Sequence, residues 1–298
     1  MNKRLLGIHI STGGGLLAGA RHAREIGCTT FQIMSGNPSA WNPGKLDLEA
    51  AAAFREYVAG YDLAPVYLHA GYLINLSCRV GRNAPIYAKS VKLLRANMDR
   101  GIALGCAGVV FHLGSRKDGT PGEAHAALVN GICRLEKEGG PFPAGVEPPE
   151  LLLENSAGAG DLTGSRFEEL AAVLDAVRDA GNCLPLGVCL DTAHLWGAGY
   201  DLSTPAAARR VIDDFDRLVG LDRLRMIHYN DSAVELGSLR DRHEHPGVGL
   251  IPIEGLRAFA RIRRIRHVPL IMETPGRTEP GDQQRMRDLV RLAGPPFA

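Results

Sequence analysis

The chain has 298 residues, with 34 Lys and Arg residues against 33 Asp and Glu residues, and a formal net charge of +1. This balance excludes an obviously basic nucleic-acid-binding arm, for which a domain pI above about 9 is typical, although a neutral sum can hide a local basic face. Apolar residues make up 45% of the chain and charged residues 22%. Such a composition is typical of a globular protein with a sizeable core and argues against whole-chain disorder.

The sequence carries no sign of membrane insertion or export. It contains no run of about 18 apolar residues, so we expect no transmembrane helix. The apolar stretch that follows Met1–Arg4 is short and contains His9, which argues against a signal peptide. The six cysteines are scattered without a C-x-x-C pair, as in reduced intracellular proteins. We therefore expect a cytoplasmic protein.

Short apolar runs alternate with longer helical patterns from one end of the chain to the other. In chain order, each of eight expected strands is followed by an expected helix: 5–10 and 13–27, 29–34 and 47–60, 65–69 and 85–104, 108–112 and 122–138, 151–154 and 167–180, 186–191 and 205–219, 224–228 and 253–262, 268–273 and 282–292. Asp47 is a typical N-cap for the second helix.

This alternation predicts an α/β fold with a parallel sheet. The strand runs are apolar throughout, as expected when helices cover them. Eight strand–helix units with right-handed crossovers can close into a (β/α)₈ TIM barrel, and an open doubly wound sheet is the alternative. No Pro/Ser-rich linker or repeat marks a second domain. We expect a single barrel domain over residues 1–298, with long and potentially functional loops at 139–150 and 229–251.

The most informative feature is the residue at the end of each strand. Six consecutive strands end on a side chain that can bind a metal: His69, His112, Glu154, Asp191, His228 and Glu273. In a (β/α)₈ barrel the C-terminal strand ends surround one mouth, where active sites lie. We therefore expect these six side chains to converge. Because clustered carboxylates repel one another, a cation among them is expected as well.

Two further pairs lie beside the same mouth. His194 follows Asp191 by three residues across a turn, and Asp241 and His243 lie in the long loop after the seventh strand. The resulting five histidines and four carboxylates exceed the three or four ligands of one zinc ion. Imidazole and carboxylate without thiolate suit Zn²⁺ or Mn²⁺ better than Ca²⁺ or Mg²⁺. Two or three metals would use all nine, and metals about 3.5–4 Å apart are typical of phosphoryl transfer.

Longer motifs around these residues resemble a known family. They are H-A-G-Y-L-I-N-L at 69–76, F-H-L-G-S at 111–115, E-N-S-A-G at 154–158, C-L-D-T-A-H at 189–194 and H-Y-N-D-S at 228–232, continuing to D-R-H-E-H at 241–245. In this order they resemble endonuclease IV, the metal-dependent apurinic/apyrimidinic endonuclease family. Matching stretches run from Gly7 to Thr274, nearly the whole chain.

The resemblance implies a (β/α)₈ barrel that holds three zinc ions, with Mn²⁺ able to replace zinc at one site. By matching motif, His69 and His112 bind one metal and share Glu154 with a second. Asp191, His228 and Glu273 complete the second site, and the third is held by His194, Asp241 and His243. Glu154 and Glu273 are also the expected catalytic residues.

The family acts as a monomer on double-stranded DNA and cleaves the phosphodiester 5′ to an abasic site, leaving a 3′-hydroxyl and a 5′-deoxyribose phosphate. A metal-bridged hydroxide is the nucleophile, and blocked 3′ ends are a further expected substrate. Tyr72 matches a tyrosine that the family inserts into DNA. Ser39 stands where the family has a wedge arginine, so that DNA contact is missing here and the lesion preference is open.

Two other functions compete with this interpretation. A divalent-metal sugar isomerase or epimerase of the xylose-isomerase-like barrel type also gathers His, Asp and Glu at strand ends, but it typically holds one or two metals. His194, Asp241 and His243 supply an extra site and count against it. A DNA-binding remnant with a decayed site is disfavoured by the complete ligand set.

Overall fold

Eight parallel strands close into a barrel in the computed structural model, which describes residues 4–34, 36–78, 80–143, 145–182, 184–276 and 279–295. The order around the barrel is β1-β10-β7-β6-β5-β4-β3-β2. The strands are β1 (Leu6–Ile10), β2 (Phe31–Met34), β3 (Val66–His69), β4 (Gly108–His112), β5 (Glu150–Glu154), β6 (Leu186–Asp191), β7 (Leu224–His228) and β10 (Leu270–Met272). The closed order confirms the predicted barrel and excludes the open sheet.

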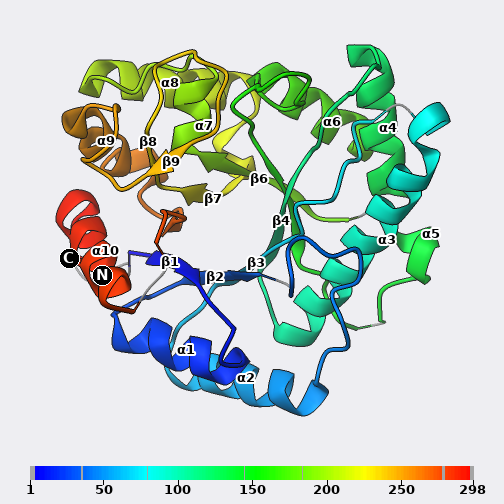
Figure 1. Ribbon diagram of the computed structural model, residues 1–298, viewed down its shortest axis with the longest axis horizontal. Helices are drawn as coiled ribbons and strands as arrows, with labels where there is room; N and C mark the ends of the chain where they lie inside the picture. The colour runs from blue at the N-terminus through cyan, green and yellow to red at the C-terminus, as the bar shows by residue number, and fades with distance from the viewer. Residues whose placement is uncertain are drawn as a thin grey trace.

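Eight helices follow the eight barrel strands and form the outer ring seen in Figure 1. They are α1 (Leu16–Glu25), α2 (Leu48–Gly60), α3 (Val80–Leu104), α4 (Pro121–Cys133), α6 (Phe167–Asp179), α8 (Pro205–Leu218), α9 (Ile253–Ala260) and α10 (Glu279–Ala293). The Asp47 side chain accepts hydrogen bonds from the N–H groups of Glu49 and Ala50, at 2.9 and 3.1 Å, which confirms it as the N-cap of α2.

Several elements differ from the sequence prediction. The helix expected over 122–138 is divided at Arg134, whose N–H is shared between two carbonyl groups, and its second part is the short α5 (Leu135–Gly139). Helix α3 begins five residues before Pro85, so this proline lies inside the helix. The residues after β6 form the helix α7 (Thr192–Gly197) instead of a turn, and the long loop after β7 contains a small antiparallel sheet of β8 (Asp231–Ser232) and β9 (His243–Glu244). The 3₁₀ turns η1 (Leu221–Arg223) and η2 (Arg263–Ile265) precede β7 and β10.

The barrel interior explains where the predicted ligands point. One buried cluster consists of an inward-facing residue from each of six strands: Tyr67, Val110, Leu152, Cys189, Met226 and Ile271. Five of the six ligands lie two residues further along the same strand, and Glu273, two residues after Ile271, directly follows β10. We call this buried cluster the plug layer. Because side chains two residues apart point to the same face of a strand, the ligands form the next layer above the plug layer, at the mouth.

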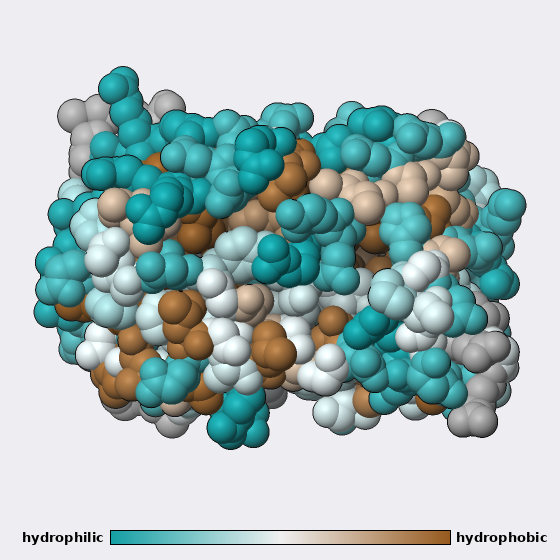
Figure 2. Space-filling model, turned by 90° about the horizontal axis from the view of Figure 1, so that it is seen from above, coloured by the Kyte–Doolittle hydropathy of each residue, from teal (hydrophilic) through white to brown (hydrophobic). Residues whose placement is uncertain are grey.

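The outer surface resembles that of an ordinary globular protein. On the face shown in Figure 2, hydrophobic residues are interspersed with hydrophilic ones. None of the helices in the described part of the chain is long and apolar enough to cross a membrane. The described cysteines, Cys28, Cys78, Cys106, Cys133 and Cys189, are all free thiols; Cys183 lies outside the described residues.

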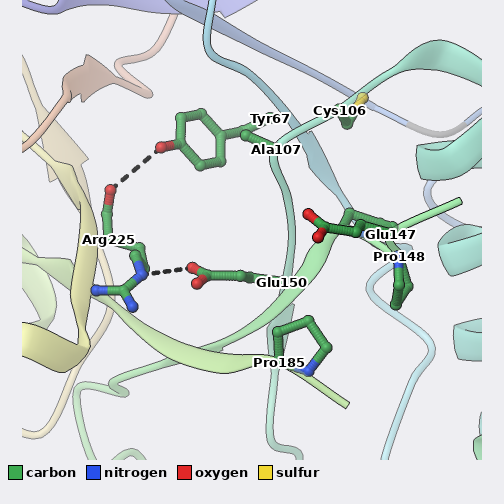
Figure 3. A pocket seen from close by; sticks show the side chains of 9 residues that line it. Tyr67, Cys106, Ala107, Glu147, Pro148, Glu150, Pro185 and Arg225 are labelled. Carbon is green, nitrogen blue, oxygen red and sulfur yellow. Dashed lines mark hydrogen bonds and ion pairs between the residues drawn. The ribbon is translucent and has the colours of Figure 1, made fainter. Parts of the chain in front are cut away.

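A cavity of about 710 Å³ lies at the end of the barrel opposite to the predicted site (Figure 3). It is lined by Glu150 and Arg225, near the starts of β5 and β7, and by Tyr67. Arg225 donates to Glu150 at 2.6 Å, and the Tyr67 hydroxyl donates to the backbone carbonyl of Arg225 at 3.2 Å. These groups satisfy one another, and Tyr67 itself belongs to the plug layer that separates the cavity from the mouth.

Candidate metal centre

The structure brings all nine predicted ligands together at the C-terminal mouth of the barrel. Eight of them fall into three groups whose ligand atoms lie within 4.8 Å of one another, and the groups share members. The ninth, Asp241, lies in hydrogen-bonding range of two of the others. This convergence of strand ends was the central expectation from the sequence.

The first group consists of His69, His112 and Glu154, from three adjacent strands. The Glu154 Oε2 atom lies 3.2 Å from Nε2 of His69 and 3.6 Å from Nε2 of His112. Glu154 and His69 are 1% exposed, whereas the His112 side chain is one-third exposed. The group is therefore open to solvent on the side of His112.

The second group contains Glu154, Asp191, His228 and Glu273. Its centre is Nδ1 of His228, which lies 3.0 Å from Oε1 of Glu154, 3.3 Å from Oε2 of Glu273 and 3.8 Å from Oδ2 of Asp191. Because Glu154 presents Oε2 to the first group and Oε1 to this one, its carboxylate bridges the two.

The third group contains Asp191, His194 and His243, with Asp241 beside it. Asp241 lies 3.1 Å from Nε2 of His194 and 3.2 Å from Nε2 of His243. The Oδ2 atom of Asp191 is 3.5 Å from Nε2 of His243. Asp191 thus belongs to two groups and links the second to the third. The family resemblance had assigned Asp191 to the second site alone.

Charges of opposite sign dominate the electrostatics of these groups. Burial raises the pKa of Glu154, but the imidazoles of His112 and His228 outweigh it and hold this pKa well below its usual range. Burial lowers the pKa of His194, while Asp191 and Asp241 raise it more strongly, to about 10. Without a metal, a proton on His194 therefore supplies part of the positive charge that the carboxylates require.

The donor set fits zinc. Imidazole nitrogens and carboxylate oxygens are its usual ligands, and a bound dication would replace the protons that the imidazoles otherwise carry. Sharing two carboxylates among three groups also accounts for nine ligands, which are too many for one ion.

Backbone carbonyl groups orient three of the imidazoles. The Nδ1 atoms of His69, His194 and His243 lie 2.8, 2.8 and 3.0 Å from the carbonyl oxygens of Ala70, Asn155 and Glu273, respectively. A carbonyl oxygen can only accept, so each Nδ1 carries the proton. In the neutral ring, Nε2 is then the nitrogen with a lone pair and it faces the group, which is the arrangement typical of metal-binding histidines.

Two buried asparagines hold the carboxylate ligands, and the sequence analysis did not identify them. Asn230 donates from Nδ2 to Oδ2 of Asp191 at 2.6 Å and accepts from the backbone N–H of Glu273 at 2.8 Å. The side chain of Asn155 accepts from the backbone N–H of Asp191 at 2.6 Å. Both asparagines lie one or two residues after a ligand, within the E-N-S-A-G and H-Y-N-D-S motifs, which was the available signal.

Asp231 fastens the loop that carries Asp241 and His243. Its Oδ1 atom accepts from the N–H groups of Ser232 and Ile251, at 2.7 and 3.0 Å. Its Oδ2 atom accepts from the N–H groups of Gly247 and Gly249, at 2.8 and 3.1 Å. A Cβ on Gly249 would lie 2.5 Å from Oδ1, so glycine permits this close approach. Both ends of the loop are thereby held to one buried carboxylate.

Asp231→Asn is therefore expected to lower the free energy of unfolding by about 2–4 kcal/mol. The amide nitrogen would face two N–H donors, and a hydrogen bond to a charged group is worth about 1.5–3 kcal/mol. Urea denaturation measures the change. The matched control is Asp213→Asn, because Asp213 is exposed and pairs with the exposed Arg264, and such a surface pair is worth less than about 1 kcal/mol. Equal stability of the two variants would contradict this role of Asp231.

Tyr72 and Ser39 lie near each other at the rim of the mouth. The Tyr72 side chain is 51% exposed, and its ring packs edge-on against His69 with 5.7 Å between ring centroids. The backbone N–H of Tyr72 donates to the carbonyl of Pro38 at 2.8 Å, which places exposed Ser39 beside it. An aromatic side chain therefore stands over the first group of ligands, next to a short polar one.

Comparisons with known proteins agree with this geometry. A family model described as a xylose isomerase-like TIM barrel matches residues 20–292. A probable endonuclease 4 of Cenarchaeum symbiosum is 36% identical, covering 97% of this chain and 99% of the relative, and one of Solibacter usitatus is 37% identical, covering 97% of both.

The chain is also similar to solved structures. The crystal structure of endonuclease IV from Thermus thermophilus is 33% identical, with a TM-score of 0.81 over 96% of this chain and 99% of that one. A D-tagatose 3-epimerase-like protein has a TM-score of 0.66 at 15% identity, over 96% of this chain and 98% of the other. The second likeness shows a common fold only.

Proposed function

Because this chain belongs to the endonuclease IV family, we propose that it is a zinc-dependent apurinic/apyrimidinic endonuclease. It hydrolyses the phosphodiester 5′ to an abasic site in double-stranded DNA and leaves a 3′-hydroxyl and a 5′-deoxyribose phosphate. The observation that carries this proposal is the sharing of Glu154 and Asp191 among three groups of metal-binding side chains at one barrel mouth.

We assign three zinc ions to these groups, with Mn²⁺ able to replace zinc at one of them. His69 and His112 hold the first ion, and Glu154 bridges it to the second. Asp191, His228 and Glu273 complete the second site. His194, Asp241 and His243 hold the third, with Asp191 close enough to contribute (3.5 Å between Asp191 Oδ2 and His243 Nε2).

The reaction needs a nucleophile at neutral pH and stabilisation of the oxygen that leaves, and bound zinc ions supply both. The protein residues hold this chemistry in place. Glu154 and Glu273 are the proposed catalytic carboxylates, because both lie close to the same atom of the second group, Nδ1 of His228, at 3.0 and 3.3 Å. The partly exposed edge of His112 leaves room for a phosphate to approach the first group.

The DNA substrate follows from the shape of the site. A nucleotide must leave the base stack to enter a barrel mouth, and an abasic nucleotide has the least stacking to lose. Tyr72, exposed over the first group, is the side chain proposed to insert into the duplex. Blocked 3′ ends are a second proposed substrate, since they need even less unstacking. Ser39 is too short to act as a second wedge, so Tyr72 alone would perform this role on its side of the mouth.

Three further properties belong to the proposal. Residues 1–298 form a single domain, the enzyme acts as a monomer, and it works in the cytoplasm. The single domain is supported by the closed barrel, whose strands come from both the N-terminal and the C-terminal parts of the chain. The cytoplasmic location is supported by the free thiols of the described cysteines, which persist in reducing compartments.

A duplex with one tetrahydrofuran abasic analogue tests the proposed function. We expect a single nick on the 5′ side of the analogue, and we expect His69→Ala to lose it, because this variant removes a ligand of the first group. Absence of nicking by wild-type protein with verified metal content would refute the proposal. About one metal per chain together with sugar isomerisation would favour the isomerase or epimerase alternative, whose fold the chain shares.

A further inference from the structure

Two strands of the barrel contribute mouth residues that are not among the nine ligands. His9 on β1 and Gln32 on β2 are neighbours in the barrel register, and both are buried, with 3% and 0% exposure. The inward layer at the mouth therefore contains a polar side chain from every barrel strand. The role of these two residues can be derived from their contacts.

The Gln32 amide contacts three groups at once. Its Nε2 atom donates to Oε1 of Glu273 and lies 3.0 Å from Nδ1 of His9. Its Oε1 atom lies 3.0 Å from Nε2 of His228. Nδ1 of His9 in turn lies 3.0 Å from the same Glu273 oxygen. One neutral side chain thus joins two of the proposed ligands of the second zinc.

The chemistry of these partners decides which way the amide points. A carboxylate oxygen can only accept hydrogen bonds, so the NH₂ group of Gln32 must face Glu273. The amide oxygen then faces His228, whose Nε2 must carry a proton in order to donate. With Nε2 protonated, the lone pair of the neutral His228 ring is on Nδ1, the atom that faces Glu154 and Glu273.

The same contacts assign the two oxygens of Glu273. Oε1 is occupied by Gln32 and His9, whereas Oε2 lies 3.3 Å from Nδ1 of His228. Oε2 is therefore the oxygen directed into the second group. Because Gln32 accepts the proton on Nε2 of His228, Nδ1 would be the His228 nitrogen available to the second metal.

We propose that Gln32, supported by His9, is a positioning residue that sets the His228 tautomer and the Glu273 carboxylate for the second metal. This inference rests on the proposed function, since the metal centre is the one assigned there. Groups that orient metal ligands typically change metal affinity or activity by about 10–100-fold when they are removed. Gln32 itself touches neither metal nor DNA in this scheme.

Two variants separate the two halves of this role. Gln32→Met keeps the length of the side chain and removes both the donor and the acceptor. Gln32→Glu keeps an acceptor for His228 but places a carboxylate against that of Glu273. Thr30→Val is the matched control, because Thr30 lies just before β2, is fully buried, and bonds Pro65 rather than the metal centre.

Chelator competition, with metals quantified per chain, is the principal measurement. We expect Gln32→Met to release one of three zinc equivalents at about 10–100-fold lower chelator concentration, and Thr30→Val to behave like the wild type. Cobalt-substituted protein should show altered visible bands in Gln32→Met. A slowly exchanging imidazole N–H resonance of zinc-loaded protein should be lost in Gln32→Met and kept in Gln32→Glu.

Wild-type zinc affinity, cobalt spectrum and imidazole resonance in folded Gln32→Met would overturn the inference. Circular dichroism verifies folding, and if Gln32→Met does not fold, Gln32→Glu decides: an affinity for the second zinc equal to that of the wild type would overturn the inference equally. None of these readouts requires nicking, so a wild-type protein that binds three metals and leaves abasic DNA intact would refute the proposed function without affecting this test.

Discussion

Glu154→Gln is expected to lower the rate of nicking at an abasic site by at least about 10³-fold, because even one donor that stabilises a transition state is worth about 10²–10³-fold. Oε2 of Glu154 lies 3.2 Å from His69, and Oε1 lies 3.0 Å from His228. Glutamine has the same shape, but its amide nitrogen has no lone pair for a metal. One of the two groups therefore loses its shared ligand.

The loss is measured as the single-turnover rate on a tetrahydrofuran duplex, with metal content determined on the same sample. Glu136→Gln is the control: Glu136 is exposed on α5, at the side of the barrel, and the same chemical change there should leave the rate unaltered. A Glu154→Gln rate within 10-fold of the wild type would show that Glu154 is not a bridging ligand. Partial metal loss with a large rate loss is the expected pattern.

The arrangement of Glu154 shows why so much of the site was predictable. Its strand, Glu150–Glu154, consists of three leucines between two glutamates, and the glutamate at the C-terminal end lies where active sites of (β/α)₈ barrels are found. The plug residue Leu152 two positions earlier shows that Glu154 points inward. The same step of two leads from Tyr67 to His69 and from Met226 to His228. Periodicity and barrel closure together therefore place these ligands.

The same rule places Gln32 on the inward face at the mouth, although the search for metal-binding residue types passed it over. Glutamine is not a typical zinc ligand, so its position on an inward face carried no signal by residue type. Its function depends on His228 at the end of β7 and on Glu273 just after β10, which are nearly two hundred residues away or more in the sequence. Such contacts follow from the closed barrel and from rotamers, not from local pattern.

Asp191 illustrates a second limit. The spacing of Asp191 and His194 suggested a pair across a turn, whereas Asp191 is the N-cap of α7 and accepts from the N–H of His194 at 2.8 Å. An aspartate that accepts a hydrogen bond from the backbone N–H three residues later is a common signal for the start of a helix, so α7 could have been expected. The sharing of Asp191 between the second and third groups could not, because it depends on the approach of His243 from a distant loop.

Removal of the metals is expected to abolish nicking and to lower the thermal stability of the protein, and added zinc should restore both. A ligand that binds only the folded state stabilises it by about 4 kcal/mol per site at a thousandfold excess over its Kd. The measurement is the melting temperature before and after dialysis against a chelator, with nicking assayed on the same samples. Melting temperatures that do not change on chelation would contradict a structural contribution of the metals.

The stabilisation by zinc should also grow as the pH rises. In the metal-free protein the pKa of His194 is about 10, because Asp191 and Asp241 outweigh the effect of burial, against about 6.5 in an unfolded chain. A raised pKa stabilises the folded state fully below about pH 6.5, and this contribution is lost as the pH rises towards 10. Zinc takes the place of that proton, so the metal-loaded protein keeps this stabilisation as the pH rises. The gap between the two melting temperatures should therefore be wider at pH 9 than at pH 6, and an equal or narrower gap at pH 9 would show that protons and metal do not compete at His194.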